Sequence, residues 1–189
     1  MKAFVLGLDH RIQFQDLDGH LELLIRQLHD EEAFDLIAEE WGSSEEFANS
    51  QTVGKKLAVS PAIRIPWINI EMPVSIQESL GIRDALRRRT HGEFDEWTLT
   101  ATTEIPSTTY LKRADELRER YWLCEVLKEL PKESVFVTCG LIHVETFASK
   151  LAHAGFQIKQ RSLCEYAWYR TKYDSTCTAV EKHLVDDRY

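Results

Sequence analysis

Short apolar runs alternate along the chain with longer stretches in which hydrophobic residues recur at helical spacing. The runs have the length of strands, and the run at 135–139 reads Val-Phe-Val-Thr-Cys before Gly140 stops it. Strands separated by helices are typical of a parallel sheet with helices on its faces. The pattern therefore predicts an α/β fold, a three-layer α/β/α arrangement around a mostly parallel sheet of about five strands. The expected strands are 3–8, 34–39, 66–71, 134–139 and 156–160, with a further edge strand at 166–169.

The helices between these strands have recognisable faces and ends. Leucine and isoleucine in 21–28 recur at i, i+3, i+4 and i+7, which places them on one helical face. The longest helical pattern covers 111–130 and ends before Pro131, and the last one ends at Gly155, which suits a left-handed C-terminal cap. Residues 95–110 are rich in Thr and are expected to form a loop or insertion. Two more helices are expected to begin at capping boxes, Ser43 with Glu46 and Ser75 with Glu78.

The size and composition describe one acidic globular domain. The 189 residues are 43% hydrophobic, so 1–189 are expected to form a single α/β domain, with its core in 1–163 and a C-terminal extension at 170–189. A net charge of −8 makes nucleic acid an unsuitable partner. No apolar stretch approaches the roughly 18 residues of a membrane span. Because no signal-peptide pattern is present either, we expect a cytoplasmic protein.

The four cysteines are Cys124, Cys139, Cys164 and Cys177, and their spacing is not that of zinc ligands. Thiols stay reduced in the cytoplasm, where disulfides are rare. We therefore expect free thiols rather than a disulfide framework.

Two tetrapeptides of one form follow two of the expected strands directly: Gly7-Leu8-Asp9-His10 and Gly140-Leu141-Ile142-His143. In an open parallel sheet, ligands bind outside the carboxyl ends of the strands. A glycine at such an end lets the backbone turn sharply and approach a ligand closely, so Gly7 and Gly140 are expected to be structural. His10 and His143 are expected to face one another across one pocket.

Carboxylates follow the strands as well. The second strand ends in Glu39 and Glu40, the third ends in Glu71, and Asp9 directly precedes His10. A histidine beside a carboxylate can act as a general base on water, whereas two histidines with one or two acids can hold a divalent metal. The sequence does not decide between a general base and a metal site. Each residue also has an ordinary structural interpretation, as a hydrogen-bonded loop histidine or a helix-capping acid.

Arg118 lies on an otherwise apolar row of the longest predicted helix, together with Ala114, Trp122 and Val126. Its guanidinium is expected to point toward the protein body and to need an anion there. That anion is either an internal Glu or a carboxylate or phosphate of a substrate. The alternative is an arginine at the helix margin whose charged end reaches solvent.

These motifs, in this order, resemble the superfamily of erythromycin esterases, TraB/Tiki proteins and ChaN-like proteins. The resemblance implies an α/β/α core with its site at the strand ends. It also implies His10 and His143 as central residues, Glu39 as their acidic partner and Arg118 as a buried arginine. The resembling segments are 5–10, 35–41, 118–122 and 135–143, in a region that extends to about residue 160.

The superfamily implies three kinds of chemistry. Its esterase branch implies water activated by His and Glu without a metal. Its Tiki branch implies a metal-dependent peptidase, and its ChaN branch implies a haem-binding protein. The chain departs from the esterase form at Leu8-Asp9, because that branch has Glu soon after the first Gly. The space between Glu71 and Leu111 is short for the superfamily's substrate-binding helices, so we do not expect a macrolide-sized substrate.

The expected function is hydrolysis of an ester, lactone or amide bond by water that His10 or His143 activates with Glu39. Arg118 is the fourth expected catalytic residue and would bind an anionic group or orient Glu39. A metal-assisted form would use His10, His143 and Glu39 to bind Mn, Co or Zn, and the cofactor is otherwise unknown.

The expected substrate is a small molecule, which Asp9, Glu40 and Glu71 are expected to contact. The alternative is a non-catalytic protein that binds a small ligand, such as haem, or a partner at the same place. Neither hypothesis involves nucleic acid or a membrane. An exposed sheet edge near 166–169 would also allow the chain to form a homodimer.

Overall fold

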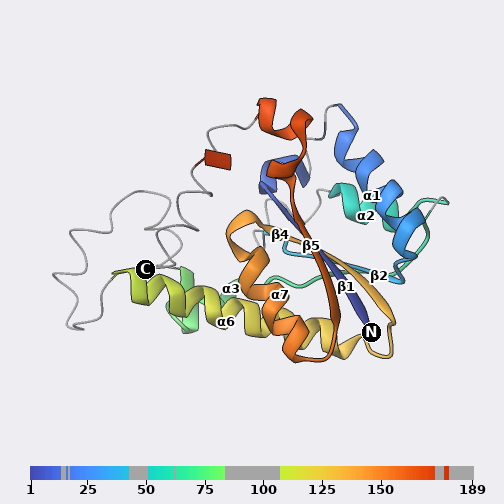
Figure 1. Ribbon diagram of the computed structural model, residues 1–189. Helices are drawn as coiled ribbons and strands as arrows, with labels where there is room; N and C mark the ends of the chain where they lie inside the picture. The colour runs from blue at the N-terminus through green and yellow to red at the C-terminus, as the bar shows by residue number, and fades with distance from the viewer. Residues whose placement is uncertain are drawn as a thin grey trace.

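The fold is known from a computed structural model that describes residues 1–13, 16, 18–42, 51–61, 63–83, 107–172 and 177–178. Within these residues, five parallel strands form one sheet in the order β3-β2-β4-β1-β5 (Figure 1). The two strands that precede the Gly-x-x-His motifs, β1 and β4, are therefore neighbours. The strands are β1 (Lys2–Leu8), β2 (Leu36–Glu39), β3 (Trp67–Asn69), β4 (Ser134–Gly140) and β5 (Gln157–Ser162).

Helices cover both faces of the sheet, which confirms the predicted three-layer α/β/α architecture (Figure 1). On one face lie α1 (His20–Glu32) and α2 (Val53–Val59). On the other lie α6 (Ser107–Lys128) and α7 (Val144–His153), with the short α3 (Val74–Ser79) beside α6. Three 3-10 turns follow strands: η1 (His10–Gln13), η3 (Leu141–His143) and η4 (Leu163–Glu165).

The core is divided by the sheet because alternate side chains of a strand point to opposite faces. Phe4, Leu6 and Leu8 of β1 pack toward α1 and α2, whereas Ala3 and Val5 pack toward α6 and α7. The central strands are apolar on both faces, as a parallel sheet between two helical layers requires. On the side of α6 and α7, Trp122 and Phe147 are both fully buried, and their rings meet edge to face.

Several predicted element ends hold, and others do not. Gly155 follows α7 with a φ of 94°, as expected for a left-handed residue beyond a helix end. The edge strand expected at 166–169 is wrong, because the amides of Tyr169 and Arg170 bond back to the Tyr166 carbonyl in a helical turn. Ser75 lies inside α3 rather than at its start, and Pro73 precedes that helix without a side-chain cap. The longest helix starts at 107, four residues earlier than predicted.

Some predictions fall on parts of the chain that the structure does not describe. The capping box of Ser43 with Glu46 lies outside the described residues, and so does the part of the predicted 95–110 loop that extends to 106. The rest of that prediction is wrong, because 107–110 belong to α6. Of the C-terminal extension at 170–189, only 170–172 and 177–178 are described. Among the described helices, none combines the length and the apolarity that a membrane crossing needs.

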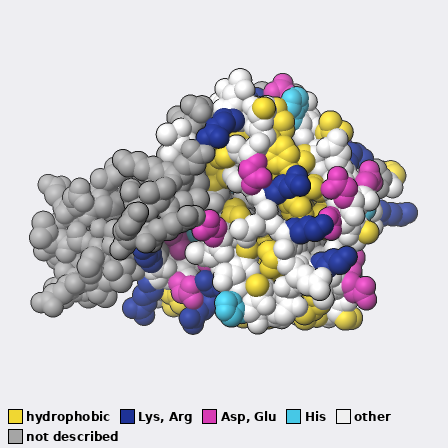
Figure 2. Space-filling model, viewed as in Figure 1, with side chains coloured by type: hydrophobic (Ala, Val, Ile, Leu, Met, Phe, Trp, Pro, Cys, Tyr) yellow, Lys and Arg dark blue, Asp and Glu magenta, His cyan; other side chains and the backbone are white. Residues whose placement is uncertain are grey.

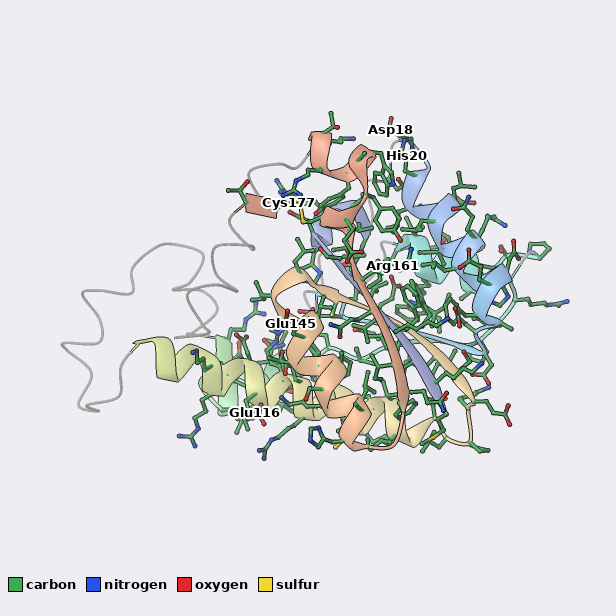
Figure 3. All side chains as sticks on the ribbon, viewed as in Figure 1. Asp18, His20, Glu116, Glu145, Arg161 and Cys177 are labelled. Carbon is green, nitrogen blue, oxygen red and sulfur yellow. A yellow bond between two sulfur atoms is a disulfide. The ribbon has the colours of Figure 1, made fainter. Side chains whose placement is uncertain are left out.

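The expectation of four free thiols is wrong for two of the cysteines. Cys164 and Cys177 form a disulfide, and both are buried in the layer that contains α1 (Figure 3). Cys124 and Cys139 are free. Disulfides persist best in oxidising compartments, and the expected cytoplasmic location stays a prediction.

The register of β1 and β4 brings the two Gly-x-x-His motifs together. Gly7 stands opposite Cys139, and Leu8 stands opposite Gly140. Each strand then leads into a 3-10 turn at the same edge of the sheet, η1 after β1 and η3 after β4. At Gly7 the start of α7 packs so closely that a Cβ would overlap Val144 Cγ2. Gly7 is thus required for the packing of α7 on β1.

We predict that Gly7→Ala destabilises the fold, because the added methyl group must displace Val144 from a well-packed layer. The free energy of unfolding should fall by about 1–3 kcal/mol, measured by urea unfolding followed through tryptophan fluorescence. Gly42→Ala is the matched control, because among the described residues, chain neighbours aside, no atom lies within 4 Å of the position of its added Cβ. An unchanged midpoint for Gly7→Ala would contradict the close packing of β1 and α7.

Candidate active site

Two histidines face one gap at the carboxyl edge of the sheet. His10 begins η1 and His143 ends η3, so each stands three residues after its glycine. His10 Nε2 lies 3.3 Å, and His143 Cδ2 3.4 Å, from the point where a Cβ of Gly140 would stand. The two imidazoles thus lie against the place that a side chain of Gly140 would occupy, and this place is called the gap below.

Glu40 is the carboxylate beside both motifs. Its Oε2 accepts the backbone N–H of Gly140 at 2.7 Å, and its Oε1 lies 3.4 Å from His10 Nε2. Its Oε1 also accepts from Arg118 Nη2 at 2.5 Å. Burial raises the pKa of the Glu40 carboxyl, but the charges of His10 and Arg118 outweigh this and hold it well below its usual value. Glu40 is thus an anion that joins His10, Gly140 and Arg118.

Arg118 points into the protein body from α6, and its anions are internal. Besides Glu40, it binds Glu71, which follows β3. Arg118 Nη2 donates to Glu71 Oε2, and Arg118 Nε donates to Glu71 Oε1 at 3.3 Å. Its guanidinium also lies 4.9 Å from the centre of the Trp122 ring. Burial lowers the pKa of Arg118, whereas Glu40 and Glu71 raise it, so the guanidinium stays charged. Arg118 was expected to bind either an internal Glu or an anionic group of a substrate, and in the structure it binds internal Glu residues.

Glu39 lies apart from the histidines. Its carboxylate accepts from the Thr52 hydroxyl and from the Trp67 indole N–H, and Thr138 donates to it at 3.4 Å. Gly54 of α2 packs against it, since a Cβ there would stand 2.7 Å from Glu39 Cδ. Successive residues at a strand end project to different sides, so Glu40 rather than Glu39 reaches the gap. Burial raises the pKa of Glu39, although the Thr52 and Trp67 hydrogen bonds oppose the rise.

The neighbours of His143 assign different roles to its two ring nitrogens. Its Nδ1 lies 2.8 Å from Glu119 Oε1, and its Nε2 lies 3.4 Å from Arg118 Nη1. A carboxylate can only accept and a guanidinium can only donate, so these two contacts place a proton on Nδ1 and turn the Nε2 lone pair toward Arg118. Asp115 Oδ1, at 3.9 Å from Nε2, is beyond hydrogen-bond distance. Glu119 is itself held by the Thr146 hydroxyl at 2.6 Å and by Lys150 Nζ at 2.9 Å.

The neighbours of His10 suit a protonated ring. Its Nδ1 lies 2.9 Å from Gln13 Oε1, and its Nε2 faces the Glu40 carboxylate. Both neighbours are acceptors, so only the imidazolium, which donates from both nitrogens, satisfies them. Partial burial lowers the pKa of His10, but the Glu40 charge and the Glu40 and Gln13 hydrogen bonds raise it to about 9. The His10 side chain is 46% exposed and lies at the solvent side of the cluster.

Three further residues of the site were not assigned a role from the sequence. Gln13 and Glu119 orient the two histidines, and Asp115 lies 3.7 Å from Arg118 Nη1 and 3.9 Å from His143 Nε2. The signal for Glu119 was its place beside Arg118 on the helix. The signal for Gln13 was its spacing of three residues after His10, which brings side chains together in a 3-10 turn.

Asp9 and Glu71, both expected to contact substrate, have partners within the protein. The Asp9 carboxylate accepts from the Arg11 guanidinium at 2.6 Å and from the Arg11 backbone N–H at 2.9 Å. Burial raises the pKa of Asp9, but the Arg11 interactions outweigh it and lower the value. The Glu71 carboxylate binds Arg118, the Met72 amide and Gln77. Asp9 therefore stands beside the site, whereas Glu71 belongs to its buried interior.

The residues named for a metal site are not gathered around one point. Glu39 is bound to Thr52 and Trp67, away from His10 and His143. The place between the Glu40 and Glu71 carboxylates is taken by the guanidinium of Arg118. Within the described part of the chain, no group of three or more His, Cys, Asp or Glu side chains is arranged to hold a metal ion. The donor set therefore does not fit Mn, Co or Zn.

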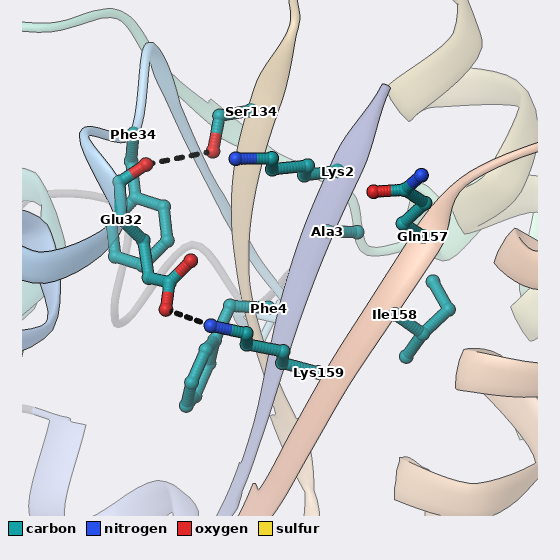
Figure 4. A pocket seen from close by; sticks show the side chains of 9 residues that line it. All are labelled: Lys2, Ala3, Phe4, Glu32, Phe34, Ser134, Gln157, Ile158 and Lys159. Carbon is teal, nitrogen blue, oxygen red and sulfur yellow. Dashed lines mark hydrogen bonds and ion pairs between the residues drawn. The ribbon is translucent and has the colours of Figure 1, made fainter.

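Two pockets lie away from the histidines. One, of about 280 Å³, opens at the amino ends of β1 and β5, where Lys159 pairs with Glu32 (Figure 4). The other is a groove between α6 and α7, near Glu116 and Glu145 (Figure 3).

Lysine, arginine and acidic side chains are interspersed on the face shown in Figure 2, so its described part has no continuous basic patch.

Comparison of the chain with family models, with curated proteins and with solved structures gives no significant match. The resemblance to the erythromycin esterase and TraB/Tiki superfamily therefore stays a prediction from the motifs.

We predict that Arg118→Met destabilises the protein by about 3–5 kcal/mol, because it leaves two carboxylates buried without their cation. Arg120→Met is the matched control on the same helix, since Arg120 is exposed and, among the described residues, forms its ion pair with Glu116 at the surface. Its cost should stay below about 0.5 kcal/mol. Equal losses for the two variants in chemical unfolding would contradict the buried ion cluster.

We also predict that stability falls in the alkaline range because of His10. Folding raises the pKa of His10 from 6.5 to about 9, so the stabilisation from its pairing is complete below pH 6.5 and is lost as the pH rises through about 9. The melting temperature from pH 6 to pH 10 should show this loss in the wild type. The His10→Gln variant should not show this alkaline fall in melting temperature. If the variant shows the same fall, the loss of stability belongs to another titrating group.

Proposed function

We propose that this protein is a hydrolase of ester, lactone or amide bonds that acts on a small molecule at the carboxyl ends of β1 and β4. The observation that carries the proposal is the opposite hydrogen bonding of two histidines across one gap. His143 presents a lone pair at Nε2, as a general base needs. His10 is a proton donor at neutral pH, as a general acid needs.

The proposed reaction uses each histidine once. A water molecule attacks the acyl carbon while His143 Nε2 takes its proton, which requires that the long contact with Arg118 opens. The bond from the acyl carbon to the leaving oxygen or nitrogen then breaks, and that atom takes the proton from His10 Nε2. Transfer of a proton from His143 to solvent and from solvent to His10 restores the starting state.

Other residues of the cluster support this division of roles. Glu119 holds the Nδ1 proton of His143 and stabilises the imidazolium that forms during the attack. Glu40 keeps His10 protonated. Arg118 is bound by two internal carboxylates, so we assign it to orienting Glu40 rather than to binding an anionic substrate.

The proposal agrees with the esterase branch of the suspected superfamily in using histidines and a carboxylate to activate water. It replaces Glu39 with Glu40 and Glu119 as the acidic partners. It includes no step through a metal, because a guanidinium already lies between Glu40 and Glu71.

A second candidate function is binding of a small ligand without turnover. The observation that raises it is the burial of His143 and Arg118 among internal partners, which weighs against turnover, while the His10 imidazole stays open to solvent. This candidate predicts saturable binding with no product. A Soret band on titration with haem would identify the haem-binding form.

We predict that His143→Ala lowers the rate of hydrolysis at least about 100-fold, since a general base contributes 10²–10⁴-fold. The probes are p-nitrophenyl acetate, a γ-lactone and an N-acyl amide. The matched control is His153→Ala, because His153 is an exposed residue at the end of α7 whose ring Nδ1 contacts the Ser149 carbonyl, away from the site. His10→Ala should lose most with the lactone and the amide, whose leaving groups need a proton.

The pH profile gives an independent check. The wild-type rate should fall as the pH rises through about 9, where His10 loses its proton. If His10→Ala and His143→Ala both hydrolyse the probes as fast as the wild type, the proposed hydrolase site is wrong.

A further inference from the structure

Gln13 is a fully buried amide at the centre of a hydrogen-bond chain that no sequence motif had indicated. Its Nε2 donates to the Glu40 carbonyl at 3.2 Å and to Thr138 Oγ1 at 3.3 Å. Its Oε1 is the acceptor opposite His10 Nδ1, at 2.9 Å. Because two acceptors face the NH₂ end, the amide has one orientation, with its oxygen toward the histidine.

The backbone explains why the two side chains meet. His10 and Gln13 are the first and last residues of η1, and side chains at i and i+3 eclipse in a 3-10 turn. The ring of His10 is thereby held from its Nδ1 side, and its Nε2 side is turned toward Glu40 and the gap over Gly140.

The chain continues to Glu39 through the sheet edge. Thr138 Oγ1 accepts from Gln13, so its hydroxyl proton is available to Glu39 Oε1 at 3.4 Å. Glu39 in turn is held by Thr52 and Trp67. The buried carboxylate that the sequence placed beside the histidines is thus connected to His10 through two side chains, Thr138 and Gln13, rather than by contact.

We infer that Gln13 is a positioning residue that fixes the orientation of the His10 ring, and that Thr138 and Glu39 act on His10 by holding the Gln13 amide. A ring turned by 180° would place carbon atoms against Gln13 Oε1 and Glu40 and would lose both hydrogen bonds. The role of His10 as proton donor rests on the proposed hydrolase function, whereas the orientation of its ring does not.

The charged groups around His10 come from several elements. Glu40 faces Nε2 from the end of β2, Arg118 reaches the same carboxylate from α6, and Asp9 precedes His10 in the chain. None of them contacts Nδ1, which faces the neutral Gln13 amide. Replacing Gln13 by Met therefore tests the orienting contact without adding or removing a charged group beside His10.

The test is NMR of the full chain with ¹⁵N-labelled histidine, which needs no substrate. In the wild type the Nδ1–H of His10 should be visible and protected from exchange with water. Gln13→Met keeps the length of the side chain but removes the acceptor, so this signal should be lost and its exchange rate should rise at least about tenfold. Gln13→Glu keeps an acceptor opposite Nδ1 but loses the two bonds that the NH₂ group donates, so it should restore part of the protection.

Gln27→Met is the matched control, because Gln27 is exposed on α1 and the substitution is chemically the same. Thr138→Val removes one of the two acceptors of the Gln13 amide, so it should give a signal with intermediate protection. Far-UV circular dichroism of each variant verifies the fold. A protected Nδ1–H in folded Gln13→Met, or its absence in the wild type, would overturn the inference.

A kinetic measurement separates this inference from the proposed function. With a probe that the wild type hydrolyses, Gln13→Met should lower kcat and leave KM unchanged, and Gln13→Glu should recover part of kcat. If no probe is hydrolysed but the NMR results are as expected, the hydrolase proposal fails and the positioning role of Gln13 stands. Equal kcat for Gln13→Met and the wild type would show that the ring is positioned without Gln13.

Discussion

The ion cluster of Arg118 with Glu40 and Glu71 is the interaction on which the candidate site depends. It joins the ends of β2 and β3 to α6, and through Glu40 it fixes the Gly140 amide and faces His10. Buried ion pairs of this kind add little net stability over apolar packing, but the removal of one partner is costly. The cluster is therefore better explained by the geometry that it imposes on two strand ends and a helix than by its contribution to folding.

The sequence predicted the layers and the meeting of His10 with His143, because both follow from strong patterns: apolar runs at regular intervals and a glycine at each strand end. It could not distinguish Glu39 from Glu40, since adjacent residues differ only in the side to which the strand end turns them. It also could not predict the protonation of the histidines, which depends on Gln13 and Glu119, residues brought in by a tight turn and by a distant helix. The Cys164–Cys177 bond was missed because the cysteine spacing alone carries no pairing signal.

The two Gly-x-x-His motifs look equivalent in the sequence, but their surroundings are not. His10 lies at the solvent side against a neutral amide and a carboxylate, whereas His143 lies buried between a carboxylate and a guanidinium. A repeated motif thus gives two different acid–base groups, because donors and acceptors around a ring decide its protonation more than the motif does.

The pairing of β1 with β4 has a consequence for how the site comes into being. The first strand starts at Lys2 and its neighbour at Ser134, so the two halves of the site are far apart in the chain and adjacent in space. Contacts of such long range form late, after a large loop has been closed. A growing or truncated chain that lacks β4 can therefore contain His10 but no site, and the cluster appears only when the sheet is complete.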